Sequence, residues 1–318
     1  MDFLHAILTG PLTDIATDPV FFAEVVLGGL MAGVMYSLVA LGFVLIFKAS
    51  GVFNFAQGVM VLFSALTLVG FRELGVPMYL SLLLTVATMV ILAIGIERVV
   101  LRPLVNQPDI ILFMATIGLT FFLEGLGQIL WGSDVKVLPI NELGIYDGRL
   151  SLKVGGGSIL ISQLDLTAAV VATLLVAFLA VFFQKTRVGL ALRAVADDHQ
   201  GAMSVGIALK NIWVVVWAVA GFVAIVAGVM WGAKSGVQFS LALIALKALP
   251  VLILGGFTSV PGAIVGGLII GVGEKIAEVY WGPAVGGAIE NWFAYVLALI
   301  FLLFRPQGLF GERIIERV

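Results

Sequence analysis

A row of polar residues interrupts one of the apolar stretches of the chain. Its members are Thr116, Thr120, Glu124 and Gln128. They follow one another at intervals of four, so on an α-helix they share one face. A carboxylate inside a membrane is costly and normally faces a cavity or a partner. We expect this stripe to line a solute pathway. The alternative, which the residues leave open, is that Glu124 is buried between helices and pairs with Lys247 or Lys275.

A second group of polar residues lies between positions 51 and 58, where two apolar runs meet. Its candidate pathway residues are Phe53, Asn54, Phe55 and Gln57. Backbone groups freed at membrane depth are tolerated only where protein or a water-lined cavity satisfies them. Carboxamides both donate and accept hydrogen bonds, which suits that task. The pattern predicts a gate or exit point. The alternative is that Asn54 caps a helix without touching solute.

Two further carboxylates, Glu274 and Glu278, lie four residues apart in a later apolar run, beside Lys275. Because they fall near the predicted outer end of that run, we expect both side chains to reach the membrane interface.

Several kinds of chemistry are excluded or disfavoured. The absence of cysteine excludes disulfides and thiolate metal sites. No G-x-x-x-x-G-K-[ST] motif occurs, so the chain lacks the phosphate-binding loop of ATPases. Only two histidines are present, His5 and His199, both outside the apolar runs, which makes zinc or a histidine proton relay improbable. With 17 basic against 19 acidic residues there is no basic field for nucleic acid.

Composition places all these residues in a polytopic membrane protein. Of the 318 residues 61% are hydrophobic and 11% are charged, whereas soluble domains carry about 25% charged residues. Glycines four apart, such as Gly29 with Gly33 and Gly267 with Gly271, predict close helix contacts. The expected fold is all-α, with about eight or nine transmembrane helices, some broken or re-entrant. The apolar runs are 20–47, 56–71, 78–99, 110–131, 166–183, 212–232, 241–256, 263–280 and 289–304.

The distribution of Lys and Arg predicts the orientation. If the C-terminus is cytoplasmic and the runs alternate, ten basic residues fall in inner connections and five in outer ones. The acidic N-terminus is then outside. Since residues 1–19 contain no Lys or Arg, we interpret the first run as a retained helix and not as a cleaved signal peptide.

Two long connections stand out. The outer one, 132–165, contains apolar or alternating stretches at 150–154 and 158–162 around Gly155, Gly156 and Gly157, which predicts a β-hairpin. It is either a plain connector or a docking surface. The inner one, 184–211, predicts a helix from about Leu190 to Val205 that ends at Gly206. Alanines at near-helical spacing give this helix a small face suited to a socket in another protein.

The inner connection carries the pattern Thr186-x-x-Gly189-x-x-x-Arg193-Ala194-x-x-x-Asp198, followed by Ala202-x-x-x-Gly206-Ile207. This pattern resembles the ATPase-docking loop of ABC importer permeases of the branched-chain amino acid family. Residues 36–42, 51–58, 254–267 and 305–311 are also similar to that family. The chain departs from the family pattern after Asn54-Phe55-Ala56, where Gln57-Gly58-Val59 replaces a frequent His, Gly and acidic residue.

The resemblance implies one transmembrane permease domain over residues 1–318 with the ABC importer permease fold. Its expected substrates are small neutral or zwitterionic solutes, foremost branched-chain or other hydrophobic amino acids. The implied partners are a homologous second permease subunit, two ABC ATPase subunits, an extracytoplasmic solute-binding protein and membrane lipid, without nucleic acid. The chain itself is expected to bind no cofactor and to be no enzyme, since the partner ATPases use ATP and Mg. The implied ATPase-coupling residues are Arg193, Ala194, Asp197, Asp198, Ala202 and Gly206.

Multi-pass insertion in the bacterial inner membrane follows from the same resemblance. The main alternative is a secondary transporter or channel for small amides or urea that needs no ATPase. An intramembrane enzyme is disfavoured because the apolar runs contain no cluster of His, Asp or Ser with Lys.

Overall fold

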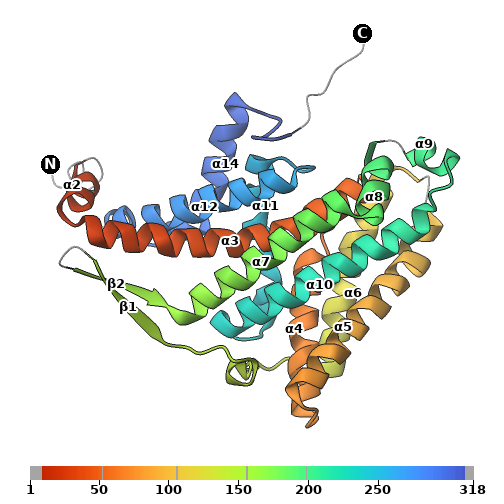
Figure 1. Ribbon diagram of the computed structural model, residues 1–318, viewed down its shortest axis with the longest axis horizontal. Coiled ribbons are helices and arrows are strands. Elements are labelled where there is room, and N and C mark those ends of the chain that lie inside the picture. Colours follow the sequence, from red (N-terminus) through yellow and green to blue (C-terminus); the bar gives the residue numbers. More distant parts are fainter. Residues whose placement is uncertain (1–8, 52, 105–106, 155–156, 198, 312–318) are drawn as a thin grey trace. The chain divides into compact units, whose positions relative to one another are not determined.

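The computed structural model describes residues 9–51, 53–104, 107–154, 157–197 and 199–311. In this part the chain is helical apart from one two-stranded sheet, one isolated bridge and the connections (Figure 1). The longer helices are α3 (Pro19–Ser50), α4 (Gln57–Glu73), α5 (Met78–Gly95), α6 (Asp109–Trp131), α7 (Gln163–Lys185), α10 (Leu209–Ser235), α11 (Ile244–Gly255), α12 (Val260–Tyr280) and α14 (Phe293–Phe304). The shorter ones are α2 (Gly10–Thr17), α8 (Arg187–Asp197), α9 (His199–Ser204) and α13 (Gly282–Val285). Single turns are the π-helical η1 (Ile96–Leu101) and the 3-10 segments η2 (Arg102–Leu104), η3 (Ile140–Leu143), η4 (Phe239–Leu243) and η5 (Ile289–Asn291).

Each predicted apolar run coincides with a helix, which confirms the predicted all-α polytopic class. Six helices in the described residues are long and apolar enough to cross a membrane, and two shorter apolar helices cover 239–255 and 293–304. Helix α4 has 17 residues and is therefore short, as the sequence indicates. Long helices satisfy their own backbone groups, which a spanning segment requires because lipid offers no hydrogen bonds.

The chain divides into two compact units. Unit 1 comprises residues 1–37, 145–171 and 247–318, and unit 2 comprises residues 38–144 and 172–246. Large apolar side chains on α5, α6 and α7, among them Ile91, Phe121 and Leu174, are exposed. A water-facing surface would not tolerate so many, whereas hydrocarbon suits them.

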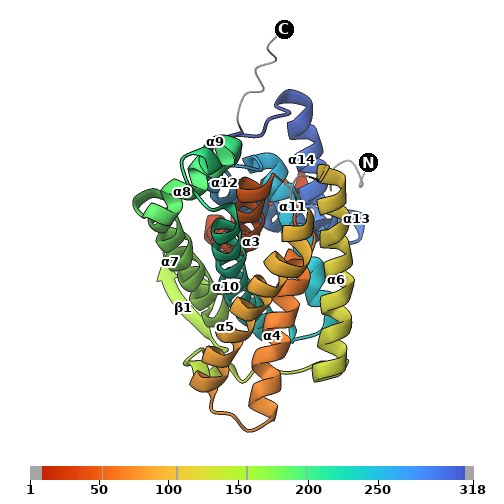
Figure 2. The same ribbon diagram turned by 90° about the vertical axis from the view of Figure 1, so that its right-hand side faces the viewer.

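Helix α4 forms the centre of unit 2. Every residue from Gln57 to Gly70 is buried, and α4 contacts α5, α6 and α10 (Figure 2). A Cβ at Gly228 of α10 would lie 2.6 Å from the Val61 carbonyl oxygen, so only glycine permits this approach. Ser64 adds a link, since its hydroxyl lies 2.8 Å from the Val61 carbonyl and 3.0 Å from that of Ala224. The helices therefore meet through small residues, as in other membrane bundles.

In unit 1, α3 and α12 cross at the predicted glycines. A Cβ at Gly33 would lie 2.6 Å from the Gly267 carbonyl oxygen, and one at Gly29 would lie 2.7 Å from Val272 Cα. The prediction of close contact is confirmed. Backbones this near to each other leave no space for larger side chains.

The predicted hairpin is present in unit 1. Strands β1 (Arg149–Val154) and β2 (Gly157–Ser162) pair antiparallel, with Leu152 opposite Ile159. Gly155 and Gly156 lie outside the described residues. The hairpin is fixed to α3, since the Leu160 N–H donates to Glu24 Oε2 at 2.8 Å.

The helix predicted from about Leu190 to Val205 is present as α8 and α9, on either side of Asp198, which lies outside the described residues. Helix α8 begins three residues earlier than predicted. The early start has a local cause. Thr186 Oγ1 accepts a hydrogen bond from the Gly189 N–H at 3.1 Å and so caps α8. The predicted end is correct, because Gly206 has a φ of +88°, which favours glycine.

Candidate solute pathway and coupling segment

The first candidate site is the break between α3 and α4, in unit 2. Helix α3 ends at Ser50, followed by Gly51 with a φ of +71°, and α4 begins at Gln57. Glycine adopts this left-handed conformation without the steric cost of a Cβ, so it ends the helix here. Of the described residues between the two helices, Phe53 and Asn54 have no regular structure and Phe55 and Ala56 form a turn. Their backbone groups need partners from elsewhere.

Thr116 of α6 supplies one such partner. Its Oγ1 accepts a hydrogen bond from the Phe55 N–H at 3.3 Å. The same hydroxyl lies 2.9 Å from the Phe113 carbonyl oxygen and 3.3 Å from that of Phe53, either of which can take its proton. Only 3% of Thr116 is exposed. The first member of the polar stripe and the break therefore form one site.

Asn54 shapes the turn within the break. It is fully buried, and its Oδ1 accepts from the Ala56 N–H at 3.1 Å. Its amide nitrogen lies 3.9 Å from Met60 Sδ, a weak acceptor. This local bonding agrees with the capping alternative for Asn54, although the α4 N-cap residue itself is Ala56.

Gln57 behaves differently from Asn54. It is fully buried, yet within the described part of the chain neither its amide nitrogen nor its amide oxygen has a hydrogen-bond partner. Its amide occupies the position where a side chain on Gly42 would project. A buried amide without partners costs about 1–3 kcal/mol. Gln57 is therefore the polar group of the break that has bonding capacity to spare.

Aromatic rings surround the break. Phe43 and Phe53 stack with centroids 4.7 Å apart, Phe55 meets Phe53 edge-on at 4.8 Å, and Phe113 meets Phe55 edge-on at 5.0 Å. The rings come from α3, the break and α6. They enclose the polar turn in apolar surface, which strengthens the hydrogen bonds inside it.

The stripe on α6 runs away from the break. Thr120 is half-buried and donates to the Thr116 carbonyl at 2.9 Å. Glu124 is half-buried, while Gln128 is exposed. At about 1.5 Å per residue, Glu124 and Gln128 lie about 12 and 18 Å along the helix from Thr116. Only the threonine end of the stripe joins the break.

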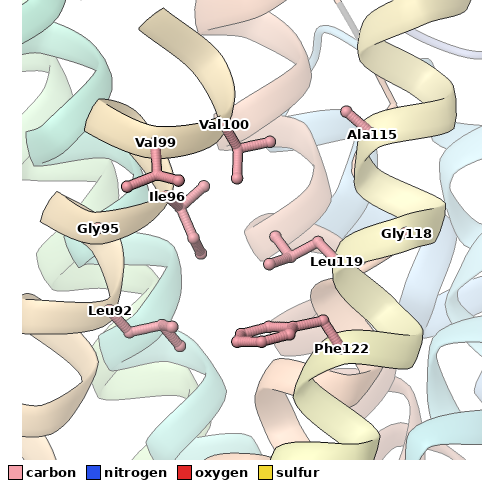
Figure 3. A pocket seen from close by; sticks show the side chains of 9 residues that line it. All are labelled: Leu92, Gly95, Ile96, Val99, Val100, Ala115, Gly118, Leu119 and Phe122. Atoms are coloured by element: carbon pink, nitrogen blue, oxygen red, sulfur yellow. The ribbon is translucent and has the colours of Figure 1, made fainter.

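A groove between α5, with η1, and α6 has a volume of about 450 Å³ (Figure 3). A polar solute would lose its hydrogen bonds in a groove lined only by apolar side chains and glycines. Its lining residues are Leu92, Gly95, Ile96, Val99, Val100, Ala115, Gly118, Leu119 and Phe122.

The second candidate site is the segment between α7 and α10, also in unit 2. Gly189 packs against the Phe183 carbonyl, where a Cβ has no space, so the chain turns sharply into α8. Arg193 and Ala194 are half-buried on α8, and Asp197 is its last residue. Asp198 lies outside the described residues. Beyond α9, the N–H groups of Gly206 and Ile207 donate to the carbonyls of Met203 and Ala202, both at 3.0 Å.

Ala202 is 3% exposed within the chain itself. Its side chain is therefore already covered and offers no surface to a partner. The exposed apolar side chains of this segment are instead Leu190, Met203 and Val205, which are 62%, 46% and 75% exposed. The other alanines that gave the near-helical spacing, Ala191, Ala194 and Ala196, are half-buried. The sequence analysis did not identify these three exposed apolar residues. The signal that could have identified them is the alternation of large apolar residues with the alanines.

The expectation that Glu274 reaches the membrane interface is wrong. Glu274 is 5% exposed and accepts hydrogen bonds from Tyr36 Oη at 2.9 Å and Lys247 Nζ at 3.2 Å. A carboxylate with two donors is stabilised inside the bundle, so it need not reach water. Lys247 thus pairs with Glu274. Glu278 instead accepts from the N–H groups of Ala288 and Glu290.

Apolar helices of spanning length, with a break that carries buried carboxamides, define the chain as a multi-pass membrane transport protein. Residues 25–305 match the family described as branched-chain amino acid transport system, permease component. The chain belongs to this family and is a permease component, as its resemblance implied.

Named relatives agree with this assignment. The high-affinity branched-chain amino acid transport system permease protein BraD of Pseudomonas aeruginosa is 30% identical, over 93% of this chain and 98% of that protein. The corresponding protein LivH of Salmonella typhimurium is 28% identical, over 94% and 98%. The solved structure titled PsaBC from Streptococcus pneumoniae in complex with Fab has a TM-score of 0.47 at 15% identity, and the match covers 88% of this chain and 91% of that one.

Proposed function

We propose that the chain is the transmembrane permease subunit of an ATP-driven importer for branched-chain or other hydrophobic amino acids. The observation that carries the proposal is the segment 184–211, whose short helices present Leu190, Met203 and Val205 to the outside of the chain. The named relatives, which transport branched-chain amino acids, support the substrate class.

The proposed partners supply what the chain lacks. Two ABC ATPase subunits bind ATP and Mg and dock on the segment 184–211, so this chain holds no cofactor. A second, homologous permease subunit completes the pathway. An extracytoplasmic solute-binding protein docks on the connection 132–165, where Leu150 and Leu152 of β1 are exposed. In this scheme residues 1–318 form one permease domain in the bacterial inner membrane.

The proposed mechanism is alternating access. Closure of the ATPases moves α8 and α9, which contact α10. Helix α10 packs on α4 through Gly228 and Ser64, and α4 begins at Gln57 in the break. This contiguous path within unit 2 lets movement of the coupling segment change the break. In the open state the Gln57 amide is expected to gain the hydrogen bonds it lacks here.

Copurification tests the coupling proposal. Tagged chain is coexpressed with the partner ATPase subunits, and the ATPase recovered per chain is measured. Val205→Glu is expected to reduce recovery at least about tenfold, since a charge would be buried unpaired at the contact. The matched control is Val135→Glu, at a residue 63% exposed but remote in sequence from the segment. Equal recovery from Val205→Glu and from wild type would contradict the docking assignment.

A further inference from the structure

Three polar side chains of unit 1 meet where α3, α11 and α12 are otherwise apolar. They are Tyr36, Lys247 and Glu274. Glu274 Oε1 accepts from Tyr36 Oη at 2.9 Å and from Lys247 Nζ at 3.2 Å. The Lys247 ammonium also lies 6.0 Å from the centre of the Tyr36 ring. The solute pathway described above uses none of the three.

The cluster places a buried acid and a base within apolar helices. Glu274 is 5% exposed and lies six residues before the end of α12, or about 9 Å along the helix, and Lys247 is the fourth residue of α11. Ionisable groups inside apolar helices are expensive, and those that persist usually mark a route for ions or solutes.

The bonding of the cluster is incomplete. Glu274 Oε2 is buried and has no hydrogen-bond partner among the residues described. Lys247 spends one of its three N–H donors on Glu274, and 27% of its side chain is exposed. Glu274 thus has an unused acceptor and Lys247 has unused donors. The two side chains already meet at Oε1 and Nζ, which lie 3.2 Å apart. A purely structural ion pair is expected to have its remaining groups satisfied as well.

We propose that Tyr36, Lys247 and Glu274 form a transient binding site for the charged groups of an α-amino acid. The inference rests on the proposed function, because it assigns a site to the solute class named there. The ammonium of the solute donates to Glu274 Oε2, and its carboxylate accepts from Lys247. An α-amino acid carries both charges on one carbon, so it fits an adjacent acid and base. A zwitterion adds no net charge to the buried pair, and the oriented charges give strong hydrogen bonds.

Three ligands that share the branched apolar side chain of leucine test the site. They are leucine, 4-methyl-2-oxopentanoate, which lacks the ammonium, and 3-methylbutylamine, which lacks the carboxylate. Saturation-transfer NMR measures their binding to the full chain in lipid nanodiscs without ATPases. Wild type is expected to bind leucine about tenfold more tightly than either analogue, since each analogue loses one charge-assisted contact.

The variants separate the two halves of the site. Glu274→Gln is expected to weaken the binding of leucine and 3-methylbutylamine and to leave the binding of 4-methyl-2-oxopentanoate unchanged. Lys247→Gln is expected to weaken the binding of leucine and 4-methyl-2-oxopentanoate and to leave the binding of 3-methylbutylamine unchanged. The matched control is Lys275→Gln, at an exposed residue next to Glu274 in the sequence, and it is not expected to change binding.

The outcomes are distinguishable. Equal leucine binding by wild type and by both site variants would overturn the inference and leave the proposed import function intact. If Glu274→Gln fails to fold, Lys247→Gln alone decides, because it predicts a selective loss. If the ligands bind in the expected pattern but no ATP-driven import is measured, the proposed function is contradicted and the binding site is not.

Discussion

The hydroxyl of Thr116 accepts a hydrogen bond from the backbone N–H of Phe55 at 3.3 Å. This contact joins α6 to the break between α3 and α4. A side chain on one helix thus holds an irregular segment at membrane depth, which is where transporters commonly place their moving parts.

Thr116→Val should loosen the break. The variant keeps the shape of the side chain but removes the bond to Phe55, so we expect the free energy of unfolding to fall by about 1 kcal/mol. Thermal unfolding followed by tryptophan fluorescence measures the change, and leucine uptake should fall with it. The control is Thr120→Val, since Thr120 bonds only to a carbonyl of its own helix. Equal effects of the two variants would show that the bond does not hold the break.

Gln57→Leu should separate stability from transport. Gln57 is buried without hydrogen-bond partners, so an apolar side chain of similar volume should leave stability unchanged or raise it by up to about 1–3 kcal/mol. If the amide is needed in another state of the transport cycle, leucine uptake should be largely lost. Uptake and thermal unfolding are measured on the same preparation. A stable variant with full uptake would remove Gln57 from the mechanism.

Ala202→Glu and Met203→Glu should fail in different ways, although the residues are neighbours. Ala202 is 3% exposed and Met203 is 46% exposed. A charge at 202 is buried in the chain's own packing, at a cost of several kcal/mol, so insertion yield and melting temperature should fall. A charge at 203 should leave both unchanged and reduce ATPase recovery. Size-exclusion profiles and copurification distinguish the two. The reverse pattern would mean that the buried face is the docking face.

A single cysteine tests the orientation. Ser151 is exposed in β1, and the sequence contains no cysteine, so Ser151→Cys introduces a single thiol. The cells are treated so that a thiol reagent reaches the outer face of the inner membrane but does not cross that membrane. Ser151→Cys should then react before the inner membrane is opened. Reaction only after lysis of that membrane would place the connection 132–165 in the cytoplasm and reverse the predicted topology.

The sequence predicts most of the fold because its determinants are local. Apolar runs of spanning length and glycines at turns are visible without tertiary information, and the hairpin at 149–162 follows from the glycines between its strands. The contact between Phe55 and Thr116 is only half visible, since each belongs to a recognisable pattern but nothing in the sequence pairs them.

The sequence did not predict which side chains of different helices contact one another. Tyr36, Lys247 and Glu274 come from helices far apart along the chain, so helical position alone suggested that Glu274 reaches the interface. Ala202 shows the same limit, because the small face of a surface helix suits a partner and the helix's own bundle equally well. Ser64 and Thr67 on α4 were also missed, although polar residues in an apolar run were the available signal.

ATP-dependent accumulation of leucine is the most direct test of the proposed import function. Vesicles contain the chain with its second permease subunit, either with or without the ATPases, and the solute-binding protein is added outside. The account predicts that internal leucine exceeds external leucine only when both the ATPases and ATP are present. Leucine or urea that equilibrates equally fast in vesicles without ATPases would contradict it and favour a channel or secondary transporter.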